Sequence, residues 1–291
     1  MDGELFYELL VSEIESIDGD AGAAYGLMLN AARKTNSPKL YERAIEIAYR
    51  ARSGDAAVEA AKAWVSAMPT SREANRYQFQ ILLGLNKIAD TVEPLKRELA
   101  SLAPAERAQA VNLLPRYFTR TADKKLAASV VEKVLLADTL TRATGPAAWA
   151  VIGTMRLHAE DAKGALNAVQ RGVALEADSE PIILLAVALI DPKMPQAEAI
   201  VRKYLGGKPT PEVRMAYSRA LLNAERYSEI YAQMLLLTAE KPDYSEAWLL
   251  RGSIELQDGK LALAETSLKT YIALNPPAAD TTPPSPMSRG L

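Results

Sequence analysis

Residues Glu246–Pro276 read EAWLLRGSIELQDGKLALAETSLKTYIALNP, and the spacing of a few residues in this stretch decides the fold. Gly252 follows Trp248 by four positions, Ala264 follows it by sixteen and Pro276 by twenty-eight. Apolar residues at helical spacing run on both sides of a polar break at QDGK. This pattern is typical of two helices joined by a short turn.

A second stretch, PAAWAVIGTMRLHAEDAKGALNAVQRGVALEAD, has the same offsets, with Gly153 and Ala165 placed four and sixteen positions after Trp149. Small residues at these positions let two antiparallel helices cross closely, and each tryptophan adds a large apolar surface beside the crossing. Gly259 predicts the left-handed residue that ends a first helix. The recurrence predicts repeats of about 34 residues.

Similar but more diverged helix pairs follow one another along the chain. Thr210 and Pro211 predict a capped helix start, and Asp191-Pro192 shortens one unit. Strand-type alternation is missing from the sequence. We therefore expect an all-α, right-handed superhelical solenoid of about eight helix pairs over residues 1–276, clearest at 146–179 and 245–276. The Pro-rich residues 277–291 are expected to be a disordered tail.

Composition excludes several classes of function. The 291 residues carry a formal net charge of -2, so no basic field is available for nucleic acid. Cysteine is absent and His158 is the single histidine, which argues against a metal site, a cofactor and catalysis. His158 and the Gly206-Gly207-Lys208 segment are interpreted as helix ends. No apolar run is long enough for a transmembrane segment, and the start MDGELFYELL does not resemble a signal peptide.

The W-x-x-[LI]-G pattern, the alanine in mid-unit and the closing proline resemble the tetratricopeptide repeat. Trp149-Ala-Val-Ile152-Gly153 fits the pattern fully. Trp248-Leu-Leu-Arg251-Gly252 departs from it at Arg251, where the pattern has a large apolar residue. The resemblance implies a protein-binding scaffold with its site in the concave groove.

The first third of the chain has a narrower resemblance. GELFYELLVSEIESIDGDAGAAYGLMLNAARKTNSPKLYERAIEIAYRARSGDAAVEAAKAWVSAMP is similar to the N-terminal region of proteobacterial tetratricopeptide-repeat lipoproteins of the outer membrane. One group of these is an adaptor for a periplasmic carboxyl-terminal processing protease and its substrates. The resemblance implies an exported adaptor in the periplasm, anchored through a leader and a lipid-carrying cysteine that this chain does not contain.

The first helix of each pair is expected to line the groove. Tyr41, Ala44, Ile45 and Ala48 would pack inward, which leaves cations on the open face for an acidic segment or a terminal carboxylate. The alternative is that these side chains are ordinary solvated helix faces. The candidate partner-binding residues are Lys39, Arg43, Arg50, Arg72, Asn75, Arg76, Arg219 and Asn223.

The two ends of the chain also carry signals. Acidic residues crowd the segment before Asn30, interpreted either as a solubilising end-cap or as a docking surface for a basic partner. At the other end no polar cap helix follows the last repeat, so Leu261, Leu268 and Ile272 are expected to be open. This open end is expected to self-associate, to bind a partner, or to mark a truncated chain.

Three functions are compatible with the sequence. The first is a non-enzymatic scaffold that binds a protein or peptide in the groove, as an exported bacterial adaptor. A cytoplasmic assembly chaperone or regulator is the alternative, and the native gene start distinguishes the two. An all-α enzyme with a site in the groove is the remote third, because the chain offers only carboxylates and scattered cations for chemistry.

Overall fold

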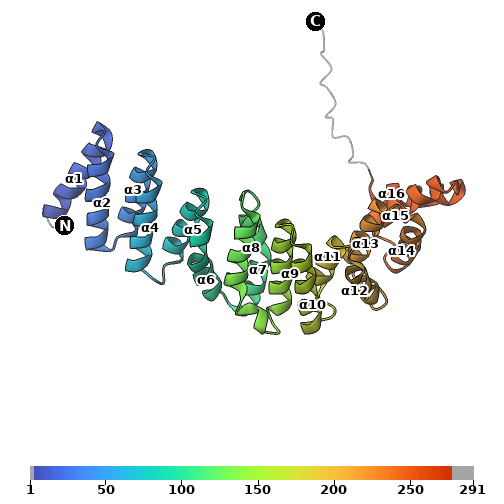
Figure 1. Ribbon diagram of the computed structural model, residues 1–291. Coiled ribbons are helices and arrows are strands. Elements are labelled where there is room, and N and C mark those ends of the chain that lie inside the picture. Colours follow the sequence, from blue (N-terminus) through green and yellow to red (C-terminus); the bar gives the residue numbers. More distant parts are fainter. Residues whose placement is uncertain (1–2, 277–291) are drawn as a thin grey trace, which may run out of the picture. The chain divides into compact units, whose positions relative to one another are not determined.

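The computed structural model describes residues 3–276, apart from the side chains of residues 18, 104 and 105. These residues form sixteen α-helices and two 3-10 helices, with no strand among them (Figure 1). The all-α prediction of a helical solenoid with about eight helix pairs is confirmed. The predicted tail, 277–291, lies outside the described residues.

The helices follow one another in chain order as sequential hairpins, in which an odd-numbered first helix is followed by an even-numbered second helix. Their bounds are α1 (Gly3–Asp18), α2 (Ala21–Thr35), α3 (Pro38–Arg50), α4 (Gly54–Ala67), α5 (Arg72–Gly84), η1 (Ile88–Thr91), α6 (Val92–Ala100), α7 (Pro104–Tyr117), α8 (Lys124–Leu135), η2 (Asp138–Leu140), α9 (Gly145–His158), α10 (Ala162–Leu175), α11 (Glu180–Ala188), α12 (Pro195–Leu205), α13 (Pro211–Asn223), α14 (Tyr227–Glu240), α15 (Ser245–Gln257) and α16 (Leu261–Leu274).

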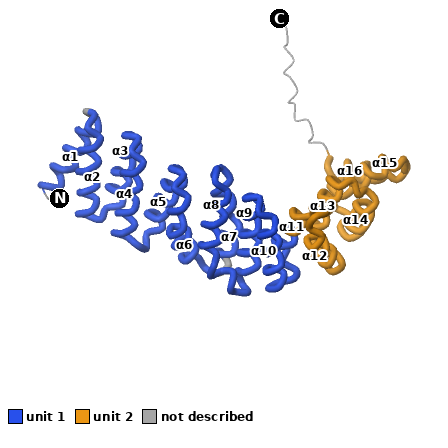
Figure 2. The backbone as a smooth tube through the Cα atoms, viewed as in Figure 1, with its two compact units in different colours: residues 1–185 blue, residues 186–291 orange. Residues whose placement is uncertain are grey.

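The chain divides into two compact units, residues 1–185 and residues 186–291 (Figure 2). Helices α1–α10 belong to the first unit and α12–α16 to the second, while α11 contains the boundary between them. The sequence predicted one repeat domain without an internal boundary.

Local sequence sets where the helices begin. The Thr210 hydroxyl accepts a hydrogen bond from the Val213 N–H, and Pro211 opens α13, as predicted. Asp20 and Asp161 cap α2 and α10 in the same way, through the N–H groups of residues 23 and 164. Each of these side chains satisfies one backbone donor that the first turn of a helix leaves without a partner.

The turn inside most hairpins contains one residue in the left-handed conformation. Gly259 has φ +72°, as the sequence predicted. Non-glycine residues take the same conformation in four other hairpins, with φ of 53° at Arg52, 55° at Asn86, 63° at Glu160 and 56° at Glu225. A side chain makes this conformation less favourable than it is for glycine, so these turns are held by the packing of the helices around them.

The small residues lie at the predicted helix crossings. Gly153 is buried where α9 meets α10, and a Cβ placed on it would lie 3.1 Å from the Ala168 Cβ. Gly252 occupies the matching place between α15 and α16, where a Cβ would lie 3.2 Å from the Ser267 Cβ. Ala165 and Ala264 are buried as well. Close approach at the crossing therefore explains why both repeats have small residues there.

The two repeat tryptophans are only half-buried. The Arg171 guanidinium lies 5.2 Å from the Trp149 ring centroid, and that of Arg251 lies 5.2 Å from the Trp248 ring centroid. The Trp248 Nε1 also donates to the Pro242 carbonyl at 2.8 Å. Both rings therefore combine apolar contact with a cation–π interaction. Arg251, which departs from the repeat pattern, belongs to this arrangement.

The largest buried side chain of unit 1 is one that the repeat pattern did not indicate. Trp64 in α4 is fully buried, stacked on Tyr41 at 6.0 Å and tilted against Tyr77 at 5.2 Å. Tyr41, Ala44, Ile45 and Ala48 of α3 are buried in the same cluster, so the predicted inward face of this helix is correct.

Unit 2 places charged side chains in its interior. Arg214 of α13 is 3% exposed, and its guanidinium donates to Gln233 at 2.8 Å and to the Glu240 carboxylate at 3.1 Å. Glu255 of α15 is fully buried and accepts a hydrogen bond from Ser267 at 2.6 Å. Buried charges need such partners, because an unpaired one would be strongly unfavourable.

Candidate protein-binding surface

The candidate residues lie on three first helices, as expected: Lys39, Arg43 and Arg50 on α3, Arg72, Asn75 and Arg76 on α5, and Arg219 and Asn223 on α13. Within unit 1, α3 and α5 belong to consecutive hairpins. The side chains differ in what they contact, and this decides which of them are available to a partner.

On α3, one of the three cations is already paired. The Arg43 Nε and Nη2 donate to the two Glu13 oxygens at 2.8 and 2.6 Å, and Nη1 donates to Glu46 at 2.9 Å. These bonds lower the pKa of Glu13 and raise that of Arg43. The side chains of Lys39 and Arg50 are exposed and make no hydrogen bond or ion pair among residues 3–276, although the charge of Arg50 also lowers the pKa of Glu13. Only these two of the three are free to meet a partner directly.

The acidic residues of the N-terminal segment bind to the chain itself. Besides the Glu13–Arg43 pair, Lys34 of α2 pairs with Glu8 at 2.8 Å and with Glu4 at 3.2 Å. The acidic face of α1 is therefore turned towards the cations of α2 and α3. Its outward side is apolar, with large exposed side chains at Phe6, Tyr7, Leu10, Ile14 and Ile17.

On α5, the three candidates line a hollow of about 620 Å³ in unit 1, here named the α5–α7 hollow. Arg72 pairs with Glu98 of α6 at 3.0 Å. Asn75 is buried, and its Nδ2 donates to the Pro94 carbonyl at 2.9 Å. Arg76 is exposed and has no ion-pair partner in the part of the chain that the structure describes.

On α13, Arg219 lines a second hollow of about 570 Å³, the α13–α15 hollow, and pairs with Glu246 of α15 at 2.6 Å. Its apolar lining includes Met215, Leu222 and Leu249. Asn223 ends α13, is exposed, and is not among the residues that line this hollow. Each hollow lies between consecutive first helices of one unit, and a second helix completes its lining, α6 in the first hollow and α16 in the second.

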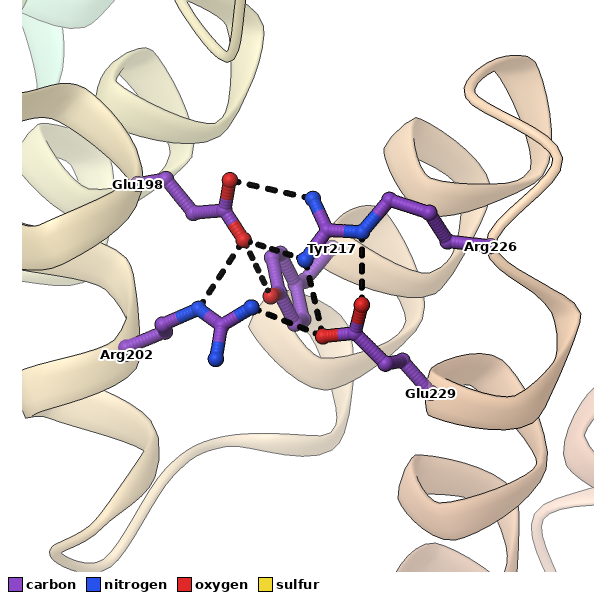
Figure 3. Close-up of polar contacts among 5 residues, drawn as sticks. All are labelled: Glu198, Arg202, Tyr217, Arg226 and Glu229. Carbon is purple, nitrogen blue, oxygen red and sulfur yellow. Dashed lines mark hydrogen bonds and ion pairs between the residues drawn. The ribbon is translucent and has the colours of Figure 1, made fainter. Parts of the chain in front are cut away.

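An ionic cluster in unit 2 was not predicted from the sequence (Figure 3). The Glu198 Oε1 of α12 accepts hydrogen bonds from Arg202 at 2.9 Å, from Tyr217 at 2.9 Å and from Arg226 at 2.7 Å. Arg226 donates a further pair of bonds to Glu229 of α14, at 2.7 and 2.8 Å. The cluster joins α12, α13 and α14.

The same contacts set the charge state of the cluster. Hydrogen bonds, chiefly from Arg226, lower the pKa of Glu198 to about 2. Burial, together with the Glu198 carboxylate, raises the pKa of Tyr217 to about 12. Two carboxylates face two guanidiniums, so the charge is balanced and every member has a partner. We interpret this cluster as a structural clamp, because it leaves no group free for chemistry.

The remaining expectations concern isolated residues. His158 is exposed in the last turn of α9, and Gly206 follows the last residue of α12. The described residues contain no cluster of His, Asp and Glu that could hold a metal ion. Among the same residues, no helix is long and apolar enough to cross a membrane.

At the end of the last hairpin, Leu261 is 65% exposed and Ile272 59%, whereas Leu268 is half-buried against Gly252. Two of the three side chains predicted to be open are therefore exposed. Self-association through this end stays a prediction.

Comparison with known proteins gives little beyond the fold itself. No family model matches the chain, and no curated protein matches it. One solved structure that is similar is a tetratricopeptide repeat protein from Parabacteroides merdae, with 13% identity over 94% of each chain and a TM-score of 0.40. That score is too low to support an argument, so the function is argued from the helices and contacts described above.

Proposed function

We propose that the chain is a non-enzymatic scaffold that binds a protein or peptide along its first helices. The observation that supports this most is the pair of hollows, one in each unit, between consecutive first helices. Four of the eight residues chosen from the sequence line them: Arg72, Asn75, Arg76 and Arg219. Repeat proteins bind extended partners along such surfaces because each hairpin adds a similar concavity.

The cations that are free of ion pairs define the proposed contact further. Lys39, Arg50 and Arg76 are exposed on α3 and α5, and no described residue pairs with them. They would meet acceptor groups of a partner without first breaking an internal ion pair, whereas Arg43 and Arg72 would have to exchange one carboxylate for another. The partner is therefore expected to bring carbonyl or carboxylate oxygens to these three positions.

Affinity capture from the source organism tests the proposal, with the double variant Arg50→Glu/Arg76→Glu as the comparison. Lys62→Glu is the matched control, because Lys62 is an exposed cation on the second helix α4 with no ion-pair partner among the described residues. The wild type and the control should retain the same partners, and the double variant should lose them. Equal capture by all three proteins would place binding on another surface.

The narrower proposal is an exported adaptor for a periplasmic carboxyl-terminal processing protease. It is supported by the resemblance of residues 3–69 to the N-terminal region of the outer-membrane lipoproteins described above. Two observations test it: a leader with a lipid-attachment cysteine at the native gene start, and faster degradation of a substrate when this chain is added to such a protease. A cytoplasmic gene product without any effect on proteolysis would favour a chaperone or regulator.

A further inference from the structure

The hairpin beside the α5–α7 hollow is irregular. Helix α6 has nine residues and is preceded by the 3-10 helix η1. Arg107, near the start of α7, donates to both oxygens of the buried Asp138 at 2.6 and 2.8 Å and to the Leu99 carbonyl at 2.7 Å. These bonds fasten α7 to the end of α6 and to η2. Both α5 and α7 pack on α6, and a hollow remains between them.

Most of the surface around this hollow is apolar. Phe79 and Leu83 of α5, Leu95 of α6, and Leu114 and Tyr117 of α7 line it. The rings of Phe79 and Tyr117 meet edge to face at 5.1 Å. Its volume of about 620 Å³ falls within the range of roughly 300–1,000 Å³ that is usual for ligand sites with largely apolar walls.

Two polar groups at the wall lack partners. The Asn75 Nδ2 donates to the Pro94 carbonyl, which fixes the orientation of the amide, and its Oδ1 is buried with no donor. Asn75 itself is 6% exposed. Buried acceptors without a donor are uncommon, but this oxygen has almost no accessible surface, so a ligand in the hollow does not reach it. Arg76, which also lines the hollow, lacks an acceptor.

The charges around the hollow are balanced. Arg72 is paired with Glu98, and the lining adds one further cation, Arg76, and one further carboxylate, Glu73. A balanced lining does not select a phosphate or a polyanion. It suits a neutral ligand that has a carbonyl acceptor and a bulky apolar group. A peptide residue has both.

We propose that the α5–α7 hollow is an anchor site for a peptide segment with a large apolar side chain. The side chain enters between Phe79 and Leu114, and a backbone carbonyl accepts from Arg76. This assignment rests on the proposed function and narrows it to one residue class of the partner, held at one place in unit 1.

The test uses the full chain and the probe N-acetyl-phenylalaninamide, which carries one peptide side chain between two amides. Amide chemical shifts in α5, α6 and α7 should respond to the probe with a dissociation constant on the order of 1 mM, given its size. N-acetyl-glycinamide, which lacks the ring, should cause no saturable change.

Three variants locate the probe. Ala110→Trp fills the hollow from α7 and should abolish the response, whereas Gln109→Trp places the same ring on the exposed face of the same helix and should leave it unchanged. Tyr117→Lys changes a residue that is 46% exposed, so the fold should tolerate it, and should weaken binding at least tenfold. The unperturbed spectrum of each variant reports whether it is folded.

Shifts outside these helices, or a response that survives Ala110→Trp, would overturn the anchor site, and so would the absence of any response to the probe. None of these results would affect the proposed scaffold function, because capture of a partner by the free cations is measured separately. Capture retained by the Arg50→Glu/Arg76→Glu variant, together with a probe response confined to α5–α7, would overturn the contact proposed for the free cations and leave the anchor site in place.

Discussion

Helices α3–α5 of unit 1 and helices α13–α16 of unit 2 stabilise the same hairpin arrangement in different ways. In the first region Trp64, Tyr41 and Tyr77 fill the interior with stacked and tilted rings. In the second, Arg214 and Glu255 are buried and held by hydrogen bonds. The repeat therefore fixes the spacing of small residues at the crossings, while the rest of each interior is closed by either apolar or ionic contacts.

The largest expected effect comes from the apolar region. Trp64→Ala should reduce the free energy of unfolding by about 3–5 kcal/mol, because a fully buried ring leaves a large cavity. Trp248→Ala is the matched comparison in unit 2, and should cost about 1–2 kcal/mol because its ring is half-buried. Urea denaturation followed by circular dichroism measures both. Equal losses of unfolding free energy in the two variants would show that the interior of unit 1 does not depend on aromatic packing more than unit 2 does.

The ionic region should respond to acid. The pKa of Glu198 is lowered from 4.5 to about 2 in the folded chain, so its contribution to stability is fully present above pH 4.5 and is lost as the pH falls towards 2. The loss amounts to at most about 3 kcal/mol. Hydrogen exchange of α12–α14 should accelerate over this pH range.

Glu198→Gln separates this effect from general acid denaturation. The variant should exchange faster at pH 7, and the acceleration of α12–α14 between pH 4.5 and 2 should be smaller than in the wild type. Peptides from α3–α5 serve as the internal reference, because they lie in the other unit. If the wild type and the variant show the same acid response, the ionic clamp does not stabilise unit 2.

The crossings should behave alike in both units. Gly153→Ala and Gly252→Ala each place a methyl group within 3.2 Å of a side-chain carbon of the facing helix. Overpacking costs typically 1–3 kcal/mol, and the better helix propensity of alanine offsets about 1 kcal/mol. We expect a net loss of about 1–2 kcal/mol for each variant, seen as a lower urea midpoint. A stabilised variant would show that the crossing has room.

The smallest effects should come from ion pairs at the surface. Arg43→Met breaks a bidentate pair with Glu13 in unit 1 and should cost about 1 kcal/mol. Arg219→Met breaks a more exposed pair with Glu246 in unit 2 and should cost less than about 0.5 kcal/mol. The free energy of unfolding of both variants is measured at low and at high salt. High salt should reduce the difference between the two losses, since exposed ion pairs are screened.

Much of the fold could be predicted because its signals are local. The offsets from Trp149 and Trp248 located the crossings, and Gly259 and Thr210 marked helix ends, since each depends on residues within one hairpin. Trp64 was missed because it lies in the second helix of its hairpin, at a position that the repeat pattern does not include. Burial of that ring depends on Tyr41 and Tyr77, which belong to two neighbouring first helices.

The candidate surface was predicted less well, because free cations cannot be recognised from one helix. Arg43, Arg72 and Arg219 pair with carboxylates that lie 30, 26 and 27 positions away. Reading charges three or four positions apart within a helix does not find these partners. Their separations lie close to the length of one repeat, so a comparison of charges at that spacing is the signal that would have found them.

The left-handed turn residues are positions at which substitution could stabilise the chain. Arg52, Glu160 and Glu225 adopt a backbone conformation that glycine adopts without steric cost, and all three side chains point away from the interior as exposed groups. Replacing them with glycine should raise the free energy of unfolding by up to about 1 kcal/mol for each position, once the greater freedom of unfolded glycine is subtracted. The gain should be seen as a higher melting temperature. A more robust protein for partner screening could thus be obtained without altering any residue of the proposed contact surface.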